Sequence, residues 1–201
     1  MTQDKQAAAK ALARRLNTAL FAIFAFWLAA LVLFWTRTAG PFRPYDAPAF
    51  DIAPLPWLLL SIAGALSVRF LPARWFRIGA LQQATRTYER VGVKTVRFFI
   101  TDGDLVNRLV RRRFPGYRVD GGEEPLKARL ETGIVGERAH LGFLVLGIGS
   151  AACAAAGGWA DWAVALTLGN VLVNFYPILL QRYTRARVEG ILAKRASTAI
   201  P

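Results

Sequence analysis

The sequence predicts an all-α, polytopic membrane protein with four transmembrane helices, both termini in the cytoplasm and a basic cytoplasmic segment between helices two and three. Of the 201 residues, 54% are hydrophobic and only 19% are charged. The mean hydropathy is +0.31, and four long stretches carry no charge. Soluble domains usually contain more charge and less apolar surface. We therefore expect one integral membrane domain over residues 1–201.

The first span is expected at 17–36, an uncharged run rich in Leu, Ala, Phe and Trp. A helix of about 20 residues crosses a ~30 Å hydrocarbon layer. A secretory signal peptide is the alternative explanation. The apolar run is too long for one, and Arg37-Thr38-Ala39-Gly40-Pro41 follows it without a clear small-residue cleavage site.

The second span, 52–68, is the shortest and begins near two prolines, so it either crosses with little tilt or lies partly in the interface. The third and fourth spans, 141–160 and 162–181, are separated only by Asp161. The Gly157-Gly158 pair supplies a turn between them. We expect these two spans to form a helical hairpin.

The distribution of positive charge sets the predicted orientation. The formal net charge is +13, which fits nucleic acid, anionic lipid or phosphorylated ligands. All Lys and Arg residues except Arg37 and Arg43 lie in the N-terminal flank, in 69–138 or after 181. Basic flanks stay in the cytoplasm, so topology explains the excess and nucleic acid is not an expected partner. We expect a bacterial-type inner membrane protein whose partners include membrane lipids.

The central segment, 69–138, contains a basic-aromatic belt around Arg74-Trp75-Phe76-Arg77 that is typical of a headgroup anchor. Residues 91–100 alternate imperfectly, as a short strand or an interfacial segment would. Asp102 or Asp104 is expected to cap an amphipathic basic helix that ends before Phe114-Pro115-Gly116. Docking on a lipid surface is the default role of such a helix.

Single copies of Cys and His limit the available chemistry. One cysteine, Cys153, excludes an intramolecular disulfide framework and cysteine-rich metal sites. We expect no metal site and no permanently bound cofactor. Together with Gly149, Ser150 and Gly157, Cys153 fits a small-residue packing pattern between helices. His140 leaves no room for a histidine metal site.

The candidate catalytic residues precede the third span. A helix starting at Glu123-Glu124-Pro125 would run directly into that span. On it, Glu137 and His140 stand three residues apart and share a face. Glu131 lies about half a turn around from His140, and would need a helix break, at Gly133 or Gly136, to join the pair. His140 is either a catalytic base or a satisfied interfacial residue.

Carboxamides follow one face of the fourth span. Asn170, Asn174, Pro177 and Gln181 fall within a stripe roughly 60° wide on an α-helix. Pro177 cannot donate a helix hydrogen bond, which frees the carbonyl of Val173. The amides could simply hold helices together. The antiparallel hairpin, however, brings this stripe and His140 to the same leaflet, which favours a polar site.

These motifs resemble those of the glycosyl-diaponeurosporenoate acyltransferases. The resemblance rests on Tyr88-Glu-Arg-Val-Gly-Val-Lys-Thr-Val-Arg-Phe-Phe-Ile-Thr-Asp-Gly-Asp104, on Glu131-Thr132 followed by Glu137-Arg-Ala-His140, and on Asn174-Phe-Tyr-Pro177-Ile-Leu-Leu-Gln181-Arg182-Tyr183 with the following Thr184-Arg185-Ala-Arg187. It covers about residues 85 to 192. The resemblance implies a membrane enzyme that esterifies the sugar of a glycosylated carotenoid.

Ester formation needs a base at the sugar hydroxyl, donors for the oxyanion and cations for the phosphates of acyl-CoA, the expected co-substrate. We expect His140 to be the base and Glu137, or else Glu131, to orient it, with the active site on the cytoplasmic side. No nucleophile is evident, so direct transfer is favoured. The expected sugar-binding or oxyanion residues are Asn170, Asn174, Gln181 and Tyr183, and the expected phosphate contacts are Arg182, Arg185 and Arg187.

Two other functions stay open. The protein could be a non-catalytic membrane subunit that binds pigment or assembles a complex, in which case it would consume no acyl-CoA. It could also acylate another lipid-linked sugar. A channel or transporter is less favoured, because polar groups concentrated at one leaflet provide no continuous polar route.

Overall fold

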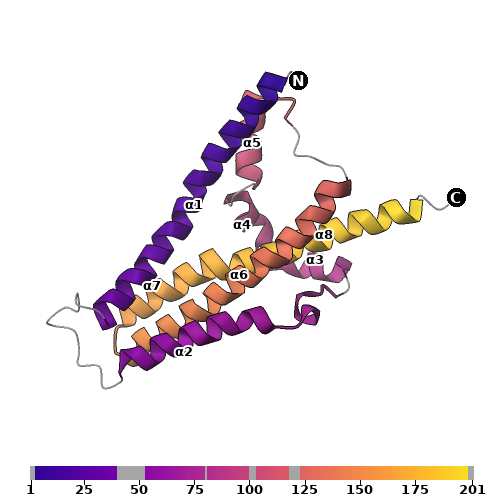
Figure 1. The fold of residues 1–201 in the computed structure, drawn as a ribbon. Coiled ribbons are helices and arrows are strands. Elements are labelled where there is room, and N and C mark those ends of the chain that lie inside the picture. The colour runs from indigo at the N-terminus through magenta and orange to yellow at the C-terminus, as the bar shows by residue number, and fades with distance from the viewer. Residues whose placement is uncertain (1–2, 40–52, 80, 100–102, 118–122, 199–201) are drawn as a thin grey trace. The chain divides into compact units, whose positions relative to one another are not determined.

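Every regular element in the described part of the chain is helical. The computed structural model describes residues 3–39, 53–79, 81–99, 103–117 and 123–198. The elements, in order, are α1 (Gln3–Ala39), α2 (Pro54–Ser67), η1 (Val68–Phe70), η2 (Ala73–Phe76), α3 (Leu81–Arg90), α4 (Val93–Phe99), α5 (Asp104–Arg113), α6 (Glu123–Ala156), α7 (Ala160–Asn170), η3 (Val171–Phe175) and α8 (Tyr176–Thr198) (Figure 1).

Three of these helical stretches are long and apolar enough to cross a bilayer. Among the described residues they are Gln3–Arg37, Leu126–Ala156 and Ala160–Thr198. This result confirms the all-α class and indicates a membrane protein. The predicted second span at 52–68 corresponds to Pro54–Phe70, a shorter apolar helix. Its crossing of the membrane, and therefore the four-span topology and its orientation, stay predictions.

The chain divides into two compact units, which we describe one at a time. Unit 1 comprises Met1–Ile23, Ile78–Ile134 and Leu179–Pro201, and unit 2 comprises Phe24–Arg77 and Val135–Ile178.

Unit 2 is built around aromatic side chains and close helix contacts. Phe34 is fully buried, and its ring centroid lies 5.0 Å from that of Trp35 and 6.1 Å from that of Trp159. A Cβ added to Gly149 of α6 would overlap Ser61 of α2, so only glycine permits this approach. Ser150 and Cys153 are buried beside it. These contacts agree with the predicted small-residue packing.

The predicted hairpin is present in unit 2. Helix α6 ends at Ala156, and α7 begins at Ala160. Gly158 has φ +75°, a conformation that glycine adopts without penalty. Its N–H donates to the Ala155 carbonyl, and the Trp159 N–H donates to the Ala154 carbonyl. This pair of bonds is the Schellman pattern, which satisfies carbonyls that the end of α6 would otherwise leave unpaired.

Unit 1 contains two small cores. In the first, Ala9 and Ala13 of α1 pack against Val106 and Val110 of α5. In the second, Val93 of α4 packs against Leu180 and Tyr183 of α8.

Unit 1 also corrects two predictions. Residues Val93–Phe99 are helical, so the strand alternative for 91–100 is wrong. Helix α5 ends at Arg113 as expected, but Gly103, not Asp104, occupies its N-cap position, and no side chain caps it. Asp104 is the first helical residue, and its carboxylate binds Arg97 instead. Asp102 lies outside the described residues.

Candidate active site

His140 and Glu137 lie one turn apart on α6, in unit 2. Glu137 is fully buried, whereas His140 is half-buried. A buried carboxylate is tolerated only when other groups compensate its charge, and Glu137 does have interaction partners in the structure.

Helix α6 is continuous from Glu123 to Ala156. The break that would have brought Glu131 onto the face of His140 is therefore absent at Gly133 and at Gly136. Glu131 is solvent-exposed, and α-helical geometry keeps it about half a turn around α6 from His140. The break that this pairing required is therefore not present in α6.

Three side chains and one backbone carbonyl form a continuous hydrogen-bonded row in unit 2. The Nδ1 of His140 lies 3.3 Å from the Oδ1 of Asn174. The Nδ2 of Asn174 donates to the Oδ1 of Asn170 at 2.7 Å. The Nδ2 of Asn170 donates to the carbonyl of Leu144 on α6 at 3.0 Å. Both asparagines are buried, with 0% exposure for Asn174 and 3% for Asn170.

The Leu144 carbonyl determines the direction of every bond in this row. A carbonyl can only accept, so the amide nitrogen of Asn170 must face it. The amide oxygen of Asn170 then accepts from Asn174, whose own oxygen is left to face the imidazole. An amide oxygen requires a donor, so the neutral ring carries its proton on Nδ1 and a lone pair on Nε2. Nε2 is therefore the basic atom of His140.

Asn174 lies in a π-helical turn, η3. In η3, the Tyr176 N–H donates to the Val171 carbonyl, five residues earlier. Pro177 has no N–H, so the α-helical bond to the Val173 carbonyl cannot form. Single π turns inside α-helices occur frequently at functional sites.

The π turn also affects the predicted stripe. The stripe was calculated at 3.6 residues per turn, and this period does not hold through Val171–Phe175. Asn170 and Asn174 remain on one face, as their hydrogen bond shows. The common face of these asparagines with Pro177 and Gln181 was calculated for a regular α-helix and stays a prediction.

Gly147 of α6 makes room for the row. A Cβ on Gly147 would overlap the side-chain amide of Asn170. The absence of a side chain at position 147 thus allows the Asn170 amide to reach the Leu144 carbonyl, one turn earlier on the same helix.

The other predicted site residues belong to unit 1, where several are committed to internal contacts. Arg185 is 2% exposed, and its aliphatic stem, with the Gln181 side chain beside it, packs against Gly133 of α6. Tyr183 is also 2% exposed, and its hydroxyl donates to Glu89 Oε1 at 3.2 Å. Arg182 is partly buried and Arg187 exposed; the guanidinium of Arg187 lies 5.7 Å from the centre of the Tyr183 ring.

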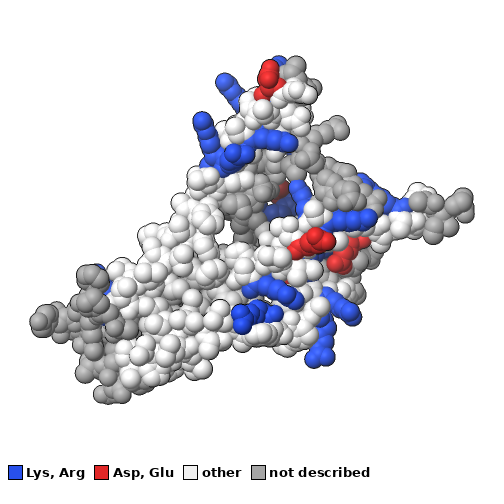
Figure 2. Space-filling model, in the orientation of Figure 1, with Lys and Arg blue, Asp and Glu red and all other residues white. Residues whose placement is uncertain are grey.

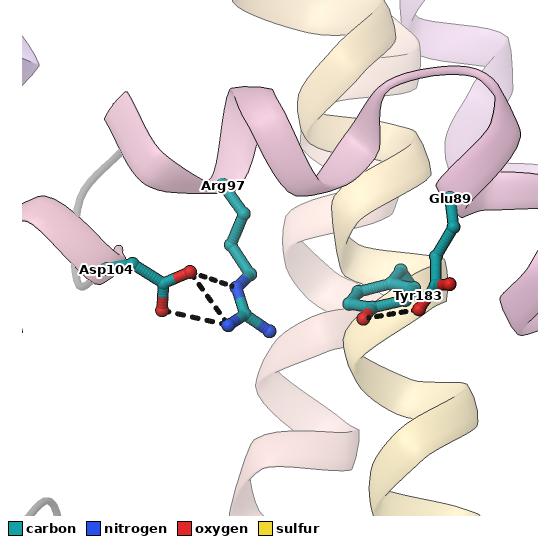
Figure 3. Close-up of polar contacts among 4 residues, drawn as sticks. All are labelled: Glu89, Arg97, Asp104 and Tyr183. Atoms are coloured by element: carbon teal, nitrogen blue, oxygen red, sulfur yellow. Dashed lines mark hydrogen bonds and ion pairs between the residues drawn. The ribbon is translucent and has the colours of Figure 1, made fainter.

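Two ion pairs tie α3, α4 and α5 together in unit 1. Figure 3 draws the pair between Arg97 and Asp104, and the hydrogen bond between Tyr183 and Glu89. Arg97 binds Asp104 through both its Nε and its Nη2, at 3.1 and 2.8 Å. Lys94 Nζ lies 2.8 Å from Glu89 Oε2. The hydrogen bond from Lys94 is the main cause that lowers the pKa of the Glu89 carboxyl; the Tyr183 hydroxyl adds to this effect and partial desolvation opposes it.

The sequence indicated the side chains of the hydrogen-bonded row but not the contacts that connect them. Asn170, Asn174 and His140 were candidates, but the Leu144 carbonyl and the π turn were not. A backbone acceptor leaves no mark in the sequence. Pro177, following Asn174 by three residues, is the signal that pointed to an irregular helix. Among the residues that the structure describes, no three His, Cys, Asp or Glu side chains are grouped as a metal site would require.

Comparison with known proteins gives one match. Residues 72–194 match a family model described as glycosyl-4,4'-diaponeurosporenoate acyltransferase, and this range exceeds half of the chain. The match contains α6, α7 and η3, and hence all the members of the hydrogen-bonded row. It confirms the resemblance seen over residues 85–192. Searches of the curated proteins and of the solved structures each gave no match.

Proposed function

Because the chain belongs to the glycosyl-4,4'-diaponeurosporenoate acyltransferase family, we propose that it transfers a fatty acyl group from acyl-CoA to a sugar hydroxyl of a glycosylated carotenoid. The reaction takes place at the cytoplasmic side of the membrane. His140 acts through Nε2 as the general base, and no acyl-enzyme forms.

The proposed reaction consumes no reactant other than acyl-CoA and the glycosylated carotenoid. Nε2 removes the proton of the sugar hydroxyl while that oxygen attacks the thioester carbonyl carbon. The tetrahedral intermediate then expels the thiolate of CoA, and Nε2 returns the proton to sulfur. The products are the sugar ester and CoA, and the histidine is regenerated.

The observation that supports this proposal most directly is the hydrogen-bonded row from His140 to the Leu144 carbonyl. The direction of the hydrogen bonds in this row leaves the lone pair of the neutral imidazole on Nε2. When Nε2 accepts a proton, the Asn174 oxygen faces a positively charged ring and stabilises it. Asn174 thus takes the orienting role that was expected of Glu137.

The remaining assignments rest on the sequence. Gln181 is the carboxamide proposed for the sugar or the oxyanion. Arg182 and Arg187 are proposed for the phosphates of acyl-CoA. Tyr183 and Arg185 are buried inside unit 1, so we propose that they support the fold of that unit and do not bind substrate directly.

The experiment that tests the base is acyl transfer in membranes that contain the wild-type chain or His140→Gln. Glutamine preserves polarity but cannot take a proton. Removal of a general base lowers turnover by about 10²–10⁴-fold. Thr132→Val on the same helix is the matched control, because Thr132 is exposed and its hydroxyl donates to the Ala128 carbonyl of its own helix. Undiminished turnover of correctly folded His140→Gln would exclude His140 as the base.

Mass spectrometry of lipid extracts from expressing and deleted cells identifies the acceptor. The proposal predicts a carotenoid glycoside whose mass increases by one acyl group, together with free CoA released in vitro. An acylated species on a different lipid-linked sugar would contradict the carotenoid assignment. Bound pigment without any CoA release would indicate a non-catalytic subunit.

A further inference from the structure

A groove along α1 is lined by cationic, polar and aromatic side chains. Within unit 1, Lys10, Arg14, Asn17, Thr18 and Phe21 line a groove of about 520 Å³, together with Ala13 and Tyr117. Their spacing of four, three, one and three residues keeps the five within roughly 100° of the α1 surface. Along the helix, the groove changes from cationic to polar and then to aromatic.

Tyr117, which follows α5, forms the other side of this groove, next to the contact between α1 and α5. Ala9 and Ala13 are buried against Val106 and Val110. Small residues at this contact let the two helices approach closely. Phe114 and Tyr117, which follow α5, pack beside the contact, and Tyr117 lines the groove. The groove is thus a product of the fold and does not depend on α1 alone.

The cations at one end of the groove form no ion pair with a carboxylate of the described residues. Lys10 and Arg14 stand four residues apart on one helix face, where like charges repel each other. Both side chains are exposed. Neither Lys10 nor Arg14 belongs to the ion pairs found among the described residues, such as Lys94 with Glu89 and Arg97 with Asp104. Figure 2 shows Lys and Arg side chains gathered over this end of α1.

The groove also lies where the first helix changes from charged to apolar. No charge follows Arg15 until Arg37, and the helix from Gln3 to Arg37 is apolar enough to cross a bilayer. Lys10 and Arg14 therefore lie where phospholipid headgroups reside. Phe21, which is 58% exposed, extends the groove toward the hydrocarbon.

We propose that this groove binds one anionic phospholipid, with its phosphate between Lys10 and Arg14 and the start of its acyl chain along Phe21. The two cations and the neighbouring polar side chains can bind a phosphate diester. The exposed aromatic side chain can pack against an acyl chain, which a soluble phosphate lacks. The site is separate from the His140 row and does not depend on the proposed acyl transfer. Bound lipid would hold α1 against α5.

The proposal is tested by lipid titration of the purified full chain. Native mass spectrometry counts the phosphatidylglycerol and phosphatidylcholine molecules retained by the wild type and by two double variants. Lys10→Gln with Arg14→Gln removes the groove cations. Lys5→Gln with Arg15→Gln is the matched control, because it removes the same charge from other faces of α1. All four side chains are exposed, so helix content and thermal unfolding should not change.

The groove variant should bind phosphatidylglycerol about tenfold more weakly or worse, the factor expected when two cations near an anionic headgroup are lost. The control variant should bind within twofold of the wild type, and phosphatidylcholine should not be selected. Equal losses in both double variants would overturn the proposal in favour of diffuse attraction to the whole basic surface. A wild-type chain that retains no phosphatidylglycerol would overturn it as well.

A competition arm separates a lipid from a soluble phosphate. Inorganic phosphate and CoA are titrated against bound phosphatidylglycerol. Neither should displace the lipid at comparable concentration, and Phe21→Asn should weaken lipid binding with both cations intact. Displacement by CoA or by phosphate, with no effect of Phe21→Asn, would show that the groove binds soluble phosphates and would refute the lipid assignment.

Discussion

The Nδ1 of His140 lies 3.3 Å from the Oδ1 of Asn174, and this contact defines which nitrogen of the ring is basic. The distance is at the long end for a hydrogen bond between neutral groups. Charge-assisted bonds are shorter and stronger, so the contact should tighten when the imidazole accepts a proton. The asparagine therefore favours the protonated ring that the proposed reaction creates. We propose that Asn174, which the sequence assigned to substrate binding, acts on the base.

Replacing Asn174 by Ala should lower kcat by roughly 10²-fold or more while KM changes little. The ring would lose the acceptor that fixes its tautomer, and a base held in the wrong tautomer loses most of its activity. Steady-state acyl transfer in detergent or membranes measures both constants. Asn174→Asp should retain more activity than Asn174→Ala, because a carboxylate also accepts from Nδ1. A rise in KM with unchanged kcat would show that Asn174 binds substrate.

Replacing Asn170 by Leu should destabilise unit 2 and reduce activity less than Asn174→Ala does. The change leaves the Leu144 carbonyl and the Asn174 amide nitrogen without the partners they have now. A buried polar group that loses its partner costs about 1–3 kcal/mol. Thermal unfolding of the purified variant measures the loss. If stability and activity both stay at the wild-type level, the row does not support His140.

The apolar framework of this protein is readable from its sequence because bilayer crossing and helix periodicity depend on local composition. Charge-free runs predicted the helices, and Gly157-Gly158 predicted the turn that Gly158 makes with φ +75°. His140 and the two asparagines could be proposed because few polar residues interrupt the apolar segments.

The connections among these residues could not be predicted, for physical reasons. At Val171–Phe175, π-helical hydrogen bonds between residues five apart replace the α-helical bonds between residues four apart, at a small difference in energy. A calculation from sequence periodicity assumes the α-helical pattern. The donor to the Leu144 carbonyl depends on the approach of two helices at Gly147. The Asp104 carboxylate could either cap α5 or form an ion pair. It binds Arg97 because the tertiary structure brings the two side chains together.

Acidification should weaken unit 1 through Glu89. Its pKa is lowered in the fold, chiefly by the hydrogen bond from Lys94. A carboxyl with a depressed folded pKa stabilises the fold above its unfolded pKa, here near the ordinary value of 4.5, and this contribution is lost as the pH falls through the folded value. Thermal unfolding followed from neutral pH to below 4 should therefore show a smaller acid-induced decrease in Glu89→Gln than in the wild type. Parallel curves would contradict the prediction.

Gly147 and Gly190 are both helical glycines, and they should respond oppositely to alanine. A Cβ at position 147 would overlap the Asn170 amide, so Gly147→Ala should displace that amide and cost about 1–3 kcal/mol of stability, the usual range for an overpacked site. Acyl transfer should fall with it, because the Asn174 amide loses its acceptor.

A Cβ added to Gly190 of α8 would meet nothing within 4 Å, and Gly190→Ala should be neutral or stabilising by up to about 1 kcal/mol, since alanine favours helices. Thermal unfolding and turnover of both variants check this pair. Equal behaviour of the two alanine variants would mean that the close approach of α6 to Asn170 does not determine the geometry of the row.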